Sequence, residues 1–272
     1  MDWLEAATHL RSLNEPAVIA TLVQVRGHAP REPGAKMVVS AAGSWGTVGG
    51  GNFEAEVIDR ARELMSGGTG GPELMSFPLS DKAPTRHGVQ CCGGEVSVLL
   101  ELLPSRRTVA VFGMGHVGFE IAHILSRLPI DLVLADSRPD AVEPARMEPL
   151  TRGPATTTIH HAPAPETVLQ GLPAGAAVLV LTHDHAEDLI LCDTALRAQA
   201  AGAGPGYLGL IGSRSKWQRF RKRLLEEGHT EEELARITCP IGLAEITGKE
   251  PISIAVGVAA DLVLRWEREK DS

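Results

Sequence analysis

The chain has 272 residues, a formal net charge of -8 and an isoelectric point near 5.7. This length is sufficient for two modest domains, each with a hydrophobic core. Because basic residues are not in excess, we expect no nucleic-acid partner, and because no apolar run approaches about 18 residues, we expect no membrane partner.

The four cysteines indicate the cellular compartment. They are Cys91, Cys92, Cys192 and Cys239, and they form neither a pair with zinc spacing nor a secreted disulfide framework. The opening segment MDWLEAATHLRSL is amphipathic and acidic, unlike a secretory signal. We therefore expect a cytoplasmic protein with reduced thiols.

The first 104 residues show short periodic segments separated by glycine-rich loops. Apolar periodicity predicts a helix over residues 4–13 and a buried strand over Ala17–Val25, followed by a loop at Gly27–Gly34. The other expected elements are strands at Ala35–Ser40, Trp45–Val48, Leu74–Leu79 and Glu95–Leu103, and a helix over Phe53–Met65 that Asn52 caps after Gly49-Gly50-Gly51. This pattern predicts a small α+β domain over residues 1–104.

Two adjacent thiols lie at the foot of the last of these strands, in Cys91-Cys92-Gly93-Gly94. A deprotonated thiol binds soft metals or carries sulfur, and glycine lets the backbone approach a ligand. Arg86 and His87 lie just upstream, and cations lower the pKa of a thiol. The run is therefore a candidate for metal or sulfur chemistry, and a buried hydrophobic thiol is the alternative.

From Thr108 onward, short apolar runs alternate with amphipathic stretches, which is typical of βαβ units around a parallel sheet. Strands are expected at Val109–Phe112, Asp131–Ala135, Thr157–Ile159, Ala177–Thr182 and Tyr207–Ile211. Helices are expected at 116–127, 165–170, 186–200, 214–227, 230–236 and 252–268. The predicted fold class is α/β, with a Rossmann-like parallel-sheet domain over residues 105–272.

A dinucleotide fingerprint follows the first of these strands. Gly113, Gly115 and Gly118 lie between the strand and a helix, and Asp136 ends the next strand. The glycines permit a tight turn and close approach of a phosphate, and the carboxylate accepts a ribose hydroxyl in such sites. The motif makes NAD(P) a candidate cofactor.

Thr182-His183-Asp184-His185, with Asp188 in the next helix, follows another predicted strand. Carboxyl ends of parallel strands face the ligand crevice. These side chains are candidates to bind a metal, relay protons or hydrogen-bond a polar ring. The alternative is that Asp184 caps the helix and the histidines are solvated.

Two further segments are candidates to bind an anion. Gly212-Ser213-Arg214-Ser215-Lys216 opens a helix, so backbone N–H groups, a hydroxyl and two cations converge there. Arg31 and Lys36 flank the first glycine loop and either bind an anion or pair with acidic residues.

Taken together, these motifs resemble the xanthine dehydrogenase accessory proteins of the XdhC/CoxI type along nearly the whole chain. The resemblance rests on Gly27–Met37, Gly49–Gly51 with Glu54, Cys92–Gly94, Gly113–Gly118, Thr182–His185 with Asp188, Gly212–Arg214, Pro240–Leu243 and Pro251–Ala255. The chain departs from the pattern at His28, where serine is common, and at the additional Cys91, since the family pattern aligns with Cys92.

The resemblance implies a chaperone that holds the molybdenum cofactor, a pterin dithiolene with a phosphate. It implies protection of the cofactor during sulfuration by a cysteine desulfurase, delivery to apo xanthine dehydrogenase, and a homodimer. The candidate thiols are Cys92, with a possible molybdenum contact, and Cys91, and which of the two acts stays open. The positions expected to contact the cofactor are Arg31, Gly34, Lys36, Gly49, Gly50, Gly51, Glu54, Gly93, Gly94, Gly113, Gly115, Gly118, Asp136, His183, Asp184, His185, Asp188, Ser213 and Arg214.

Two enzymatic alternatives stay open. One is an NAD(P)-dependent oxidoreductase that uses the Gly113–Gly118 turn and Asp136, with the His183 cluster as acid and base. The other is a metal-dependent hydrolase or transferase built on His183, His185 and Asp188 with the thiols. A carrier that does not turn over a substrate is the expected function.

Overall fold

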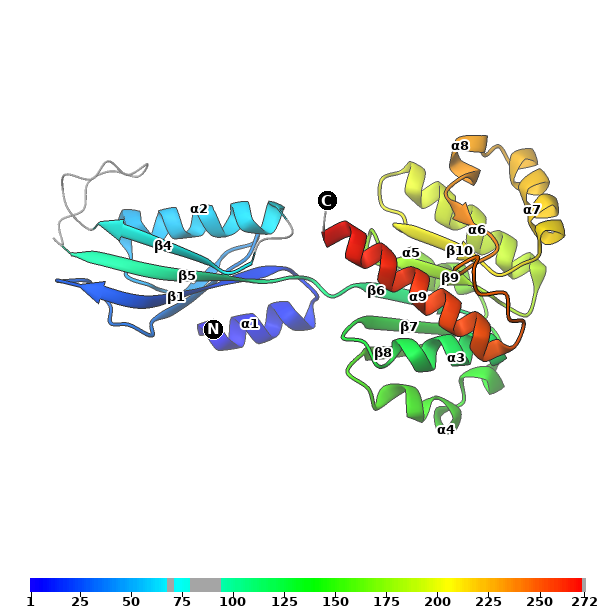
Figure 1. Ribbon diagram of the computed structural model, residues 1–272, viewed down its shortest axis with the longest axis horizontal. Helices are drawn as coiled ribbons and strands as arrows, with labels where there is room; N and C mark the ends of the chain where they lie inside the picture. The colour runs from blue at the N-terminus through cyan, green and yellow to red at the C-terminus, as the bar shows by residue number, and fades with distance from the viewer. Residues whose placement is uncertain (68–70, 79–93, 271–272) are drawn as a thin grey trace. The chain divides into compact units, whose positions relative to one another are not determined.

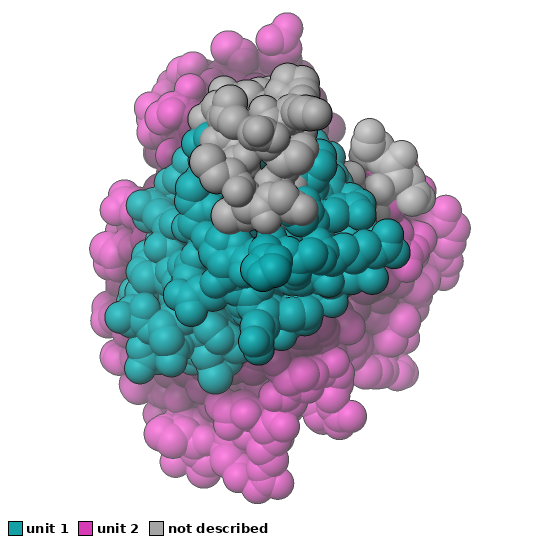
Figure 2. Space-filling model, turned by 90° about the vertical axis from the view of Figure 1, so that its left-hand side faces the viewer, with its two compact units in different colours: residues 1–105 teal, residues 106–272 magenta. Residues whose placement is uncertain are grey.

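The structure, a computed structural model, describes residues 1–67, 71–78 and 94–270. The chain divides into two compact units, Met1–Ser105 and Arg106–Ser272 (Figure 2). Every helix in the described ranges is too short or too polar to cross a lipid bilayer.

The first unit is a five-stranded antiparallel sheet with a helix packed on each face (Figure 1). Alternate residues of its strands contact different helices, since Val18 and Ala20 join the core with one helix while Ala17 and Val38 join the core with the other. The sheet order is β3-β2-β1-β5-β4. The elements are α1 (Trp3–Ser12), β1 (Ala17–Arg26), β2 (Lys36–Val39), β3 (Ser44–Gly46), α2 (Gly51–Gly67), β4 (Glu73–Pro78) and β5 (Glu95–Leu103).

The second unit is a six-stranded parallel sheet with the order β11-β10-β9-β6-β7-β8. Its strands are β6 (Thr108–Phe112), β7 (Asp131–Asp136), β8 (Thr156–His161), β9 (Ala177–Val180), β10 (Tyr207–Leu210) and β11 (Ile237–Thr238). Its helices are α3 (His116–Leu125), η1 (Pro139–Val142), α4 (Pro144–Met147), η2 (Glu148–Thr151), α5 (Pro165–Gln170), α6 (His185–Ala200), α7 (Arg214–Glu226), α8 (Glu231–Leu234) and α9 (Pro251–Lys270).

Helices cover both faces of this parallel sheet. Side chains of α3 and α9 share one core with alternate strand residues such as Val109 and Val111. The intervening residues, Ala110 and Phe112, pack in a second core with α5, α6 and α7. Central strands β6, β9 and β10 are buried on both faces, which explains their unbroken apolar sequences.

These sheets confirm the predicted α/β fold class with a Rossmann-like parallel sheet. Two expectations in the first unit were wrong. α2 begins at Gly51, so Asn52 lies in its first turn rather than at its N-cap. The strand expected over Trp45–Val48 is Ser44–Gly46, because Thr47 and Val48 turn toward the Glu54 carboxylate.

Candidate functional site

The carboxyl ends of the parallel strands all lie at one edge of the sheet. The direction in which successive strands are added to the sheet changes at β6. β6 lies between β7 and β9, so the chain adds β7 and β8 on one side before returning to β9 on the other. Ligands of open parallel sheets bind in the crevice at such a switch point. The segments Gly113–Gly118 and Thr182–Asp188 follow β6 and β9 and therefore flank this crevice.

The three fingerprint glycines have different local environments. A Cβ on Gly113, whose φ is +106°, would lie 2.2 Å from the Leu181 carbonyl oxygen, and one on Gly118 would lie 1.9 Å from the Gly113 carbonyl oxygen. A Cβ on Gly115 would meet nothing within 4 Å. Gly113 and Gly118 are therefore required for packing, whereas Gly115 leaves the N-terminus of α3 open to a ligand.

Asp136 is engaged within the protein. Its Oδ1 accepts hydrogen bonds from Arg138 N (2.9 Å) and Nε (3.0 Å), and its Oδ2 accepts them from Met114 N (2.7 Å) and Arg138 Nη2 (2.8 Å). A carboxylate offers about four acceptor positions, so these bonds occupy it fully. The expected ribose contact at Asp136 would require breaking its pair with Arg138, and the carboxylate instead anchors the glycine turn.

The pKa of Asp136 reflects these contacts. Burial alone raises it, but the hydrogen bonds from Arg138 and the Met114 N–H outweigh burial and lower the pKa below its usual value. The charged form therefore stabilises the fold above the unfolded pKa of about 3.9, and this contribution is lost as the pH falls through the folded pKa.

We expect the Asp136→Asn substitution to lower the urea midpoint of unfolding at about pH 7, and its difference from wild type to shrink below about pH 4. Urea titrations followed by circular dichroism at several pH values measure this difference. Asp140→Asn, which changes an exposed carboxylate nearby, is the matched control. A difference that stays constant with pH would contradict the anchoring role of the charged carboxylate.

Two histidines lie at the surface after β9, His183 in the loop and His185 at the first position of α6. Asp184 caps α6, because its Oδ1 accepts a hydrogen bond of 2.8 Å from Ala186 N. His183 and His185 are exposed, and His183 Nδ1 lies 3.9 Å from Glu187 Oε2. Both imidazoles are thus accessible at the rim of the crevice, where they can donate hydrogen bonds to a polar ring or accept them.

The buried carboxylate of Asp188 connects the segments that follow β9 and β10. Its Oδ1 accepts hydrogen bonds from Thr182 N (2.9 Å) and Thr182 Oγ1 (2.8 Å), and its Oδ2 lies 2.5 Å from Lys216 Nζ. Lys216 also donates to the Ile211 carbonyl at the end of β10. Asp188 is fully buried and the Lys216 side chain nearly so, so the pair links the ends of β9 and β10.

The buried pairing of Lys216 and the part played by Arg138 are not predicted from the sequence. Lys216 was expected to bind an anion at the surface, and its place in the basic run Arg214–Arg223 gave no sign of burial. Arg138 was not considered, although its position directly after the strand-ending Asp136 is a usable signal. Anion binding at the N-terminus of α7 stays a prediction; there Ser213 Oγ accepts a hydrogen bond from Lys216 N (3.2 Å) and Arg214 is exposed.

The two described thiols lie near this ion pair. Cys192 is fully buried, and burial raises the pKa of its thiol far above the usual range. Cys239 is half-buried, and burial raises its pKa to about 11. Both thiols are therefore protonated at neutral pH and poorly nucleophilic.

In the first unit, Glu54 closes the triple-glycine turn. Its Oε2 accepts hydrogen bonds from Thr47 Oγ1, Val48 N (3.1 Å) and Gly50 N (3.0 Å). Gly49 N donates to Thr47 Oγ1 (3.1 Å). Gly49, Gly50 and Gly51 all have positive φ, so the turn needs glycine there. The contacts expected between these residues and a cofactor stay predictions.

The other candidate cations are Arg31, in the loop between β1 and β2, and Lys36, the first residue of β2. Lys36 Nζ donates to Thr21 Oγ1 (2.7 Å) and lies 5.6 Å from the centre of the Trp3 ring, so it is partly engaged. Arg31 and Gly34 are exposed. A Cβ on Gly94 would lie 2.6 Å from the His28 carbonyl oxygen, so Gly94 lies against the same loop.

Cys91, Cys92 and Gly93 lie outside the described residues. Within the described ranges, no three histidine, cysteine, aspartate or glutamate side chains form a group that could hold a metal ion. The alternative of a metal site on His183, His185 and Asp188 is not supported among these residues, because Asp188 pairs with Lys216. The structure thus forms two groups of candidate residues, one in each unit.

Comparison with known proteins identifies relatives of the whole chain. The uncharacterized protein YqeB of Escherichia coli K12 is 30% identical over 97% of this chain, which spans 46% of the length of YqeB. The molybdenum cofactor insertion chaperone PaoD of the same organism is 26% identical over 94% of this chain and 86% of PaoD. A Bacillus halodurans crystal structure described as a xanthine dehydrogenase matches with 19% identity over 97% of this chain and 95% of that chain, but its TM-score of 0.46 is too low to support a conclusion.

Family models match both units. The model described as the XdhC and CoxI family matches residues 10–78, and the model described as the XdhC Rossmann domain matches residues 109–262. The second match covers more than half of the chain and includes every candidate residue of the crevice. The resemblance predicted from the motifs is confirmed, and the chain belongs to the XdhC family.

Proposed function

We propose that this protein holds the molybdenum cofactor as its cargo and inserts it into an apo molybdenum enzyme of the xanthine dehydrogenase class. The similarity to PaoD, which extends over 94% of the chain, carries this proposal. The proposal includes a cytoplasmic homodimer that receives sulfur from a cysteine desulfurase while the cofactor is bound.

The crevice at the carboxyl edge of the parallel sheet supports binding of such a cargo. The open N-terminus of α3 at Gly115 and the N-terminus of α7 beside Arg214 suit the phosphate of the cofactor. His183 and His185 suit the hydrogen-bonding edge of the pterin. The Asp188–Lys216 pair links the segment that carries His183 and His185 to the segment that precedes Arg214.

The thiol run is the second element of the proposal. Cys92 would contact the soft molybdenum or a sulfur atom in transit, since thiolates are preferred ligands of soft metals. Gly94, two residues later, packs on the backbone of Arg26 and His28. Gly94 therefore lies against the loop that carries Arg31 and Gly34.

Cys92→Ala is expected to lower cofactor retention and activation of the apo-dehydrogenase at least about tenfold, because the soft ligand is lost. Cys91→Ala, one residue away, is the matched control and should retain both. Molybdenum content after gel filtration and the rate of dehydrogenase activation measure the two effects. Full retention and activation by Cys92→Ala would remove the thiol from the mechanism while leaving the carrier function to be judged from cofactor binding.

The nicotinamide alternative receives no support from the fingerprint carboxylate. All acceptor positions of Asp136 are used by Arg138 and Met114, which leaves none for a ribose hydroxyl. A rise in the melting temperature with NADH or NADPH that the Gly115→Ala substitution removes would restore this alternative.

A further inference from the structure

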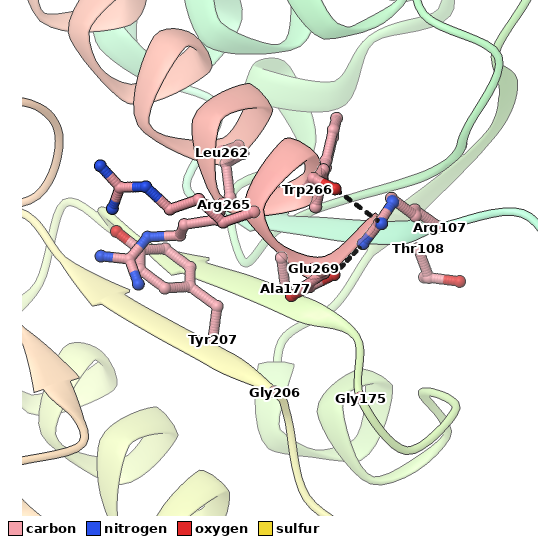
Figure 3. Close-up of a pocket in the computed structure, with 11 residues that line it drawn as sticks. Arg107, Thr108, Gly175, Ala177, Gly206, Tyr207, Leu262, Arg265, Trp266 and Glu269 are labelled. Atoms are coloured by element: carbon pink, nitrogen blue, oxygen red, sulfur yellow. Dashed lines mark hydrogen bonds and ion pairs between the residues drawn. The ribbon is translucent and has the colours of Figure 1, made fainter. Parts of the chain in front are cut away.

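A second candidate binding site lies at the opposite edge of the parallel sheet (Figure 3). It is a pocket of about 330 Å³ formed by the amino ends of β6, β9 and β10 and the last turns of α9. Cavities of about 300 to 1,000 Å³ are typical of small-molecule sites. No motif discussed above accounts for this pocket.

Arg265 is positioned at the pocket by neighbours that leave its outer end accessible. Its Nε donates to Asp261 Oδ1 (3.0 Å), and its guanidinium lies 4.5 Å from the centre of the Tyr207 ring. The Tyr207 hydroxyl donates to Asp261 Oδ2 (3.1 Å), so the carboxylate holds both side chains. In the part of the chain that the structure describes, Nη1 and Nη2 of Arg265 have no hydrogen-bond partner, and 42% of the side chain is exposed.

Arg107 supplies a second positioned guanidinium. It pairs with Glu269 through Nη1, donates to the Trp266 carbonyl oxygen through Nη2 (3.3 Å) and lies 5.4 Å from the centre of the Trp266 ring. Figure 3 marks the contacts of this arginine with Trp266 and Glu269. A guanidinium that is stacked and paired loses little further freedom when it binds a ligand.

The remaining wall consists of Thr108, Arg268, two apolar side chains and bare backbone. Ala177 and Leu262 are buried and line the pocket with Gly175 and Gly206. A Cβ on Gly175 would meet nothing within 4 Å, so the backbone is open there. The pocket therefore combines two guanidinium groups, each paired on one side with the carboxylate of Asp261 or Glu269, with a small apolar surface, in a chain whose formal net charge is -8.

We propose that this pocket binds a small organic oxyanion, a carboxylate or a phosphate ester, at the sheet edge opposite the crevice. Planar guanidinium groups match the two oxygens of a carboxylate or phosphate, and the apolar wall accepts the carbon skeleton that carries them. This site is independent of the cofactor crevice and of the proposed chaperone function.

The test uses the full chain with inorganic pyrophosphate and succinate as probes, at an ionic strength matched with sodium chloride. Calorimetry and thermal unfolding are expected to show saturable binding of at least one probe, and the stronger probe indicates phosphate or carboxylate chemistry. R265Q is expected to weaken binding at least about tenfold, since a charge-assisted contact is lost. R127Q, which changes an exposed arginine at the end of α3, should bind as wild type.

R107Q provides a second variant if R265Q does not fold, and it is expected to weaken binding of the same probe. Circular dichroism verifies the fold of each variant before binding is measured. The proposal is overturned if neither probe binds, if sodium chloride alone reproduces the thermal shift, or if folded R265Q or R107Q binds as wild type. The last result would assign the bound anion to another site, such as the helix N-termini of the crevice.

Discussion

Replacing Asp188 with alanine is expected to lower the free energy of unfolding by about 3 to 5 kcal/mol. The substitution leaves the Lys216 ammonium buried without its carboxylate and removes the acceptor of the Thr182 N–H and hydroxyl. Because these contacts join the ends of β9 and β10, the loops with His183 and Arg214 should also lose their relative position. Urea unfolding measures the stability, and cofactor retention measures the loop geometry.

The double variant Asp188→Leu/Lys216→Met separates the buried charge from the position of the loops. Replacing both partners with apolar side chains removes the unpaired charge, so most of the lost stability should return. Cofactor retention should stay low, because the polar link between the loops is absent. Glu226→Ala, which breaks the exposed pair with Lys222, should leave the urea midpoint unchanged. An Asp188→Ala protein as stable as the Glu226→Ala control would contradict the stabilising role of the buried Asp188–Lys216 pair.

The second large effect is expected at the glycine turn. Gly113→Ala should destabilise the protein by about 3 to 5 kcal/mol, because it combines a strained backbone with overpacking. The residue has a φ of +106°, and the new Cβ would lie 2.2 Å from the Leu181 carbonyl oxygen and 2.7 Å from Thr182 Cα. Thermal and urea unfolding measure this loss.

Gly115→Ala is the matched control within the same turn. Its Cβ would enter open space and its φ of -69° suits alanine, so the variant should fold as wild type. The methyl group would nevertheless stand where a phosphate approaches the N-terminus of α3, and cofactor retention should fall. If Gly115→Ala lost stability like Gly113→Ala, or if it folded and retained the cofactor fully, the assigned division between packing and binding glycines would be wrong.

Much of the second unit could be predicted because its sequence pattern is unambiguous. Strands such as Val109–Phe112 are buried on both faces, and they read as short apolar runs between amphipathic helices. The edge of the sheet that carries the candidate site was predicted from the glycine turn and the His183 segment, since both come directly after such strands, whereas the switch point came from the observed strand order. The structure shows that the glycine turn and the segment before His183 are in contact, because Gly113 packs on Leu181.

Other elements carry too little periodicity to be predicted. Residues 139–151 form η1, α4 and η2, each with proline in its first turn, and each is too short to show an apolar stripe. β11 consists of Ile237–Thr238 alone and is defined by its pairing with β10. In both places long-range packing, rather than local propensity, decides the structure.

The partners of the site side chains could not be predicted from motifs. The fingerprint indicates that Asp136 lies at the end of β7, but whether it faces a ligand depends on Arg138, which pairs with it. Lys216 occupies a run of exposed basic residues, and only the approach of α6 to α7 places its ammonium on Asp188. Motif position thus identified the edge of the sheet, while the contacts had to come from the folded structure.

Cofactor content after gel filtration tests the proposed carrier function most directly. The protein would be mixed with released molybdenum cofactor and gel-filtered, and molybdenum and oxidised-pterin fluorescence would be measured in the protein peak. A carrier should elute with equimolar molybdenum and pterin and then activate an apo-dehydrogenase. Folded protein that elutes with neither would contradict the proposal that this XdhC-family protein holds the cofactor.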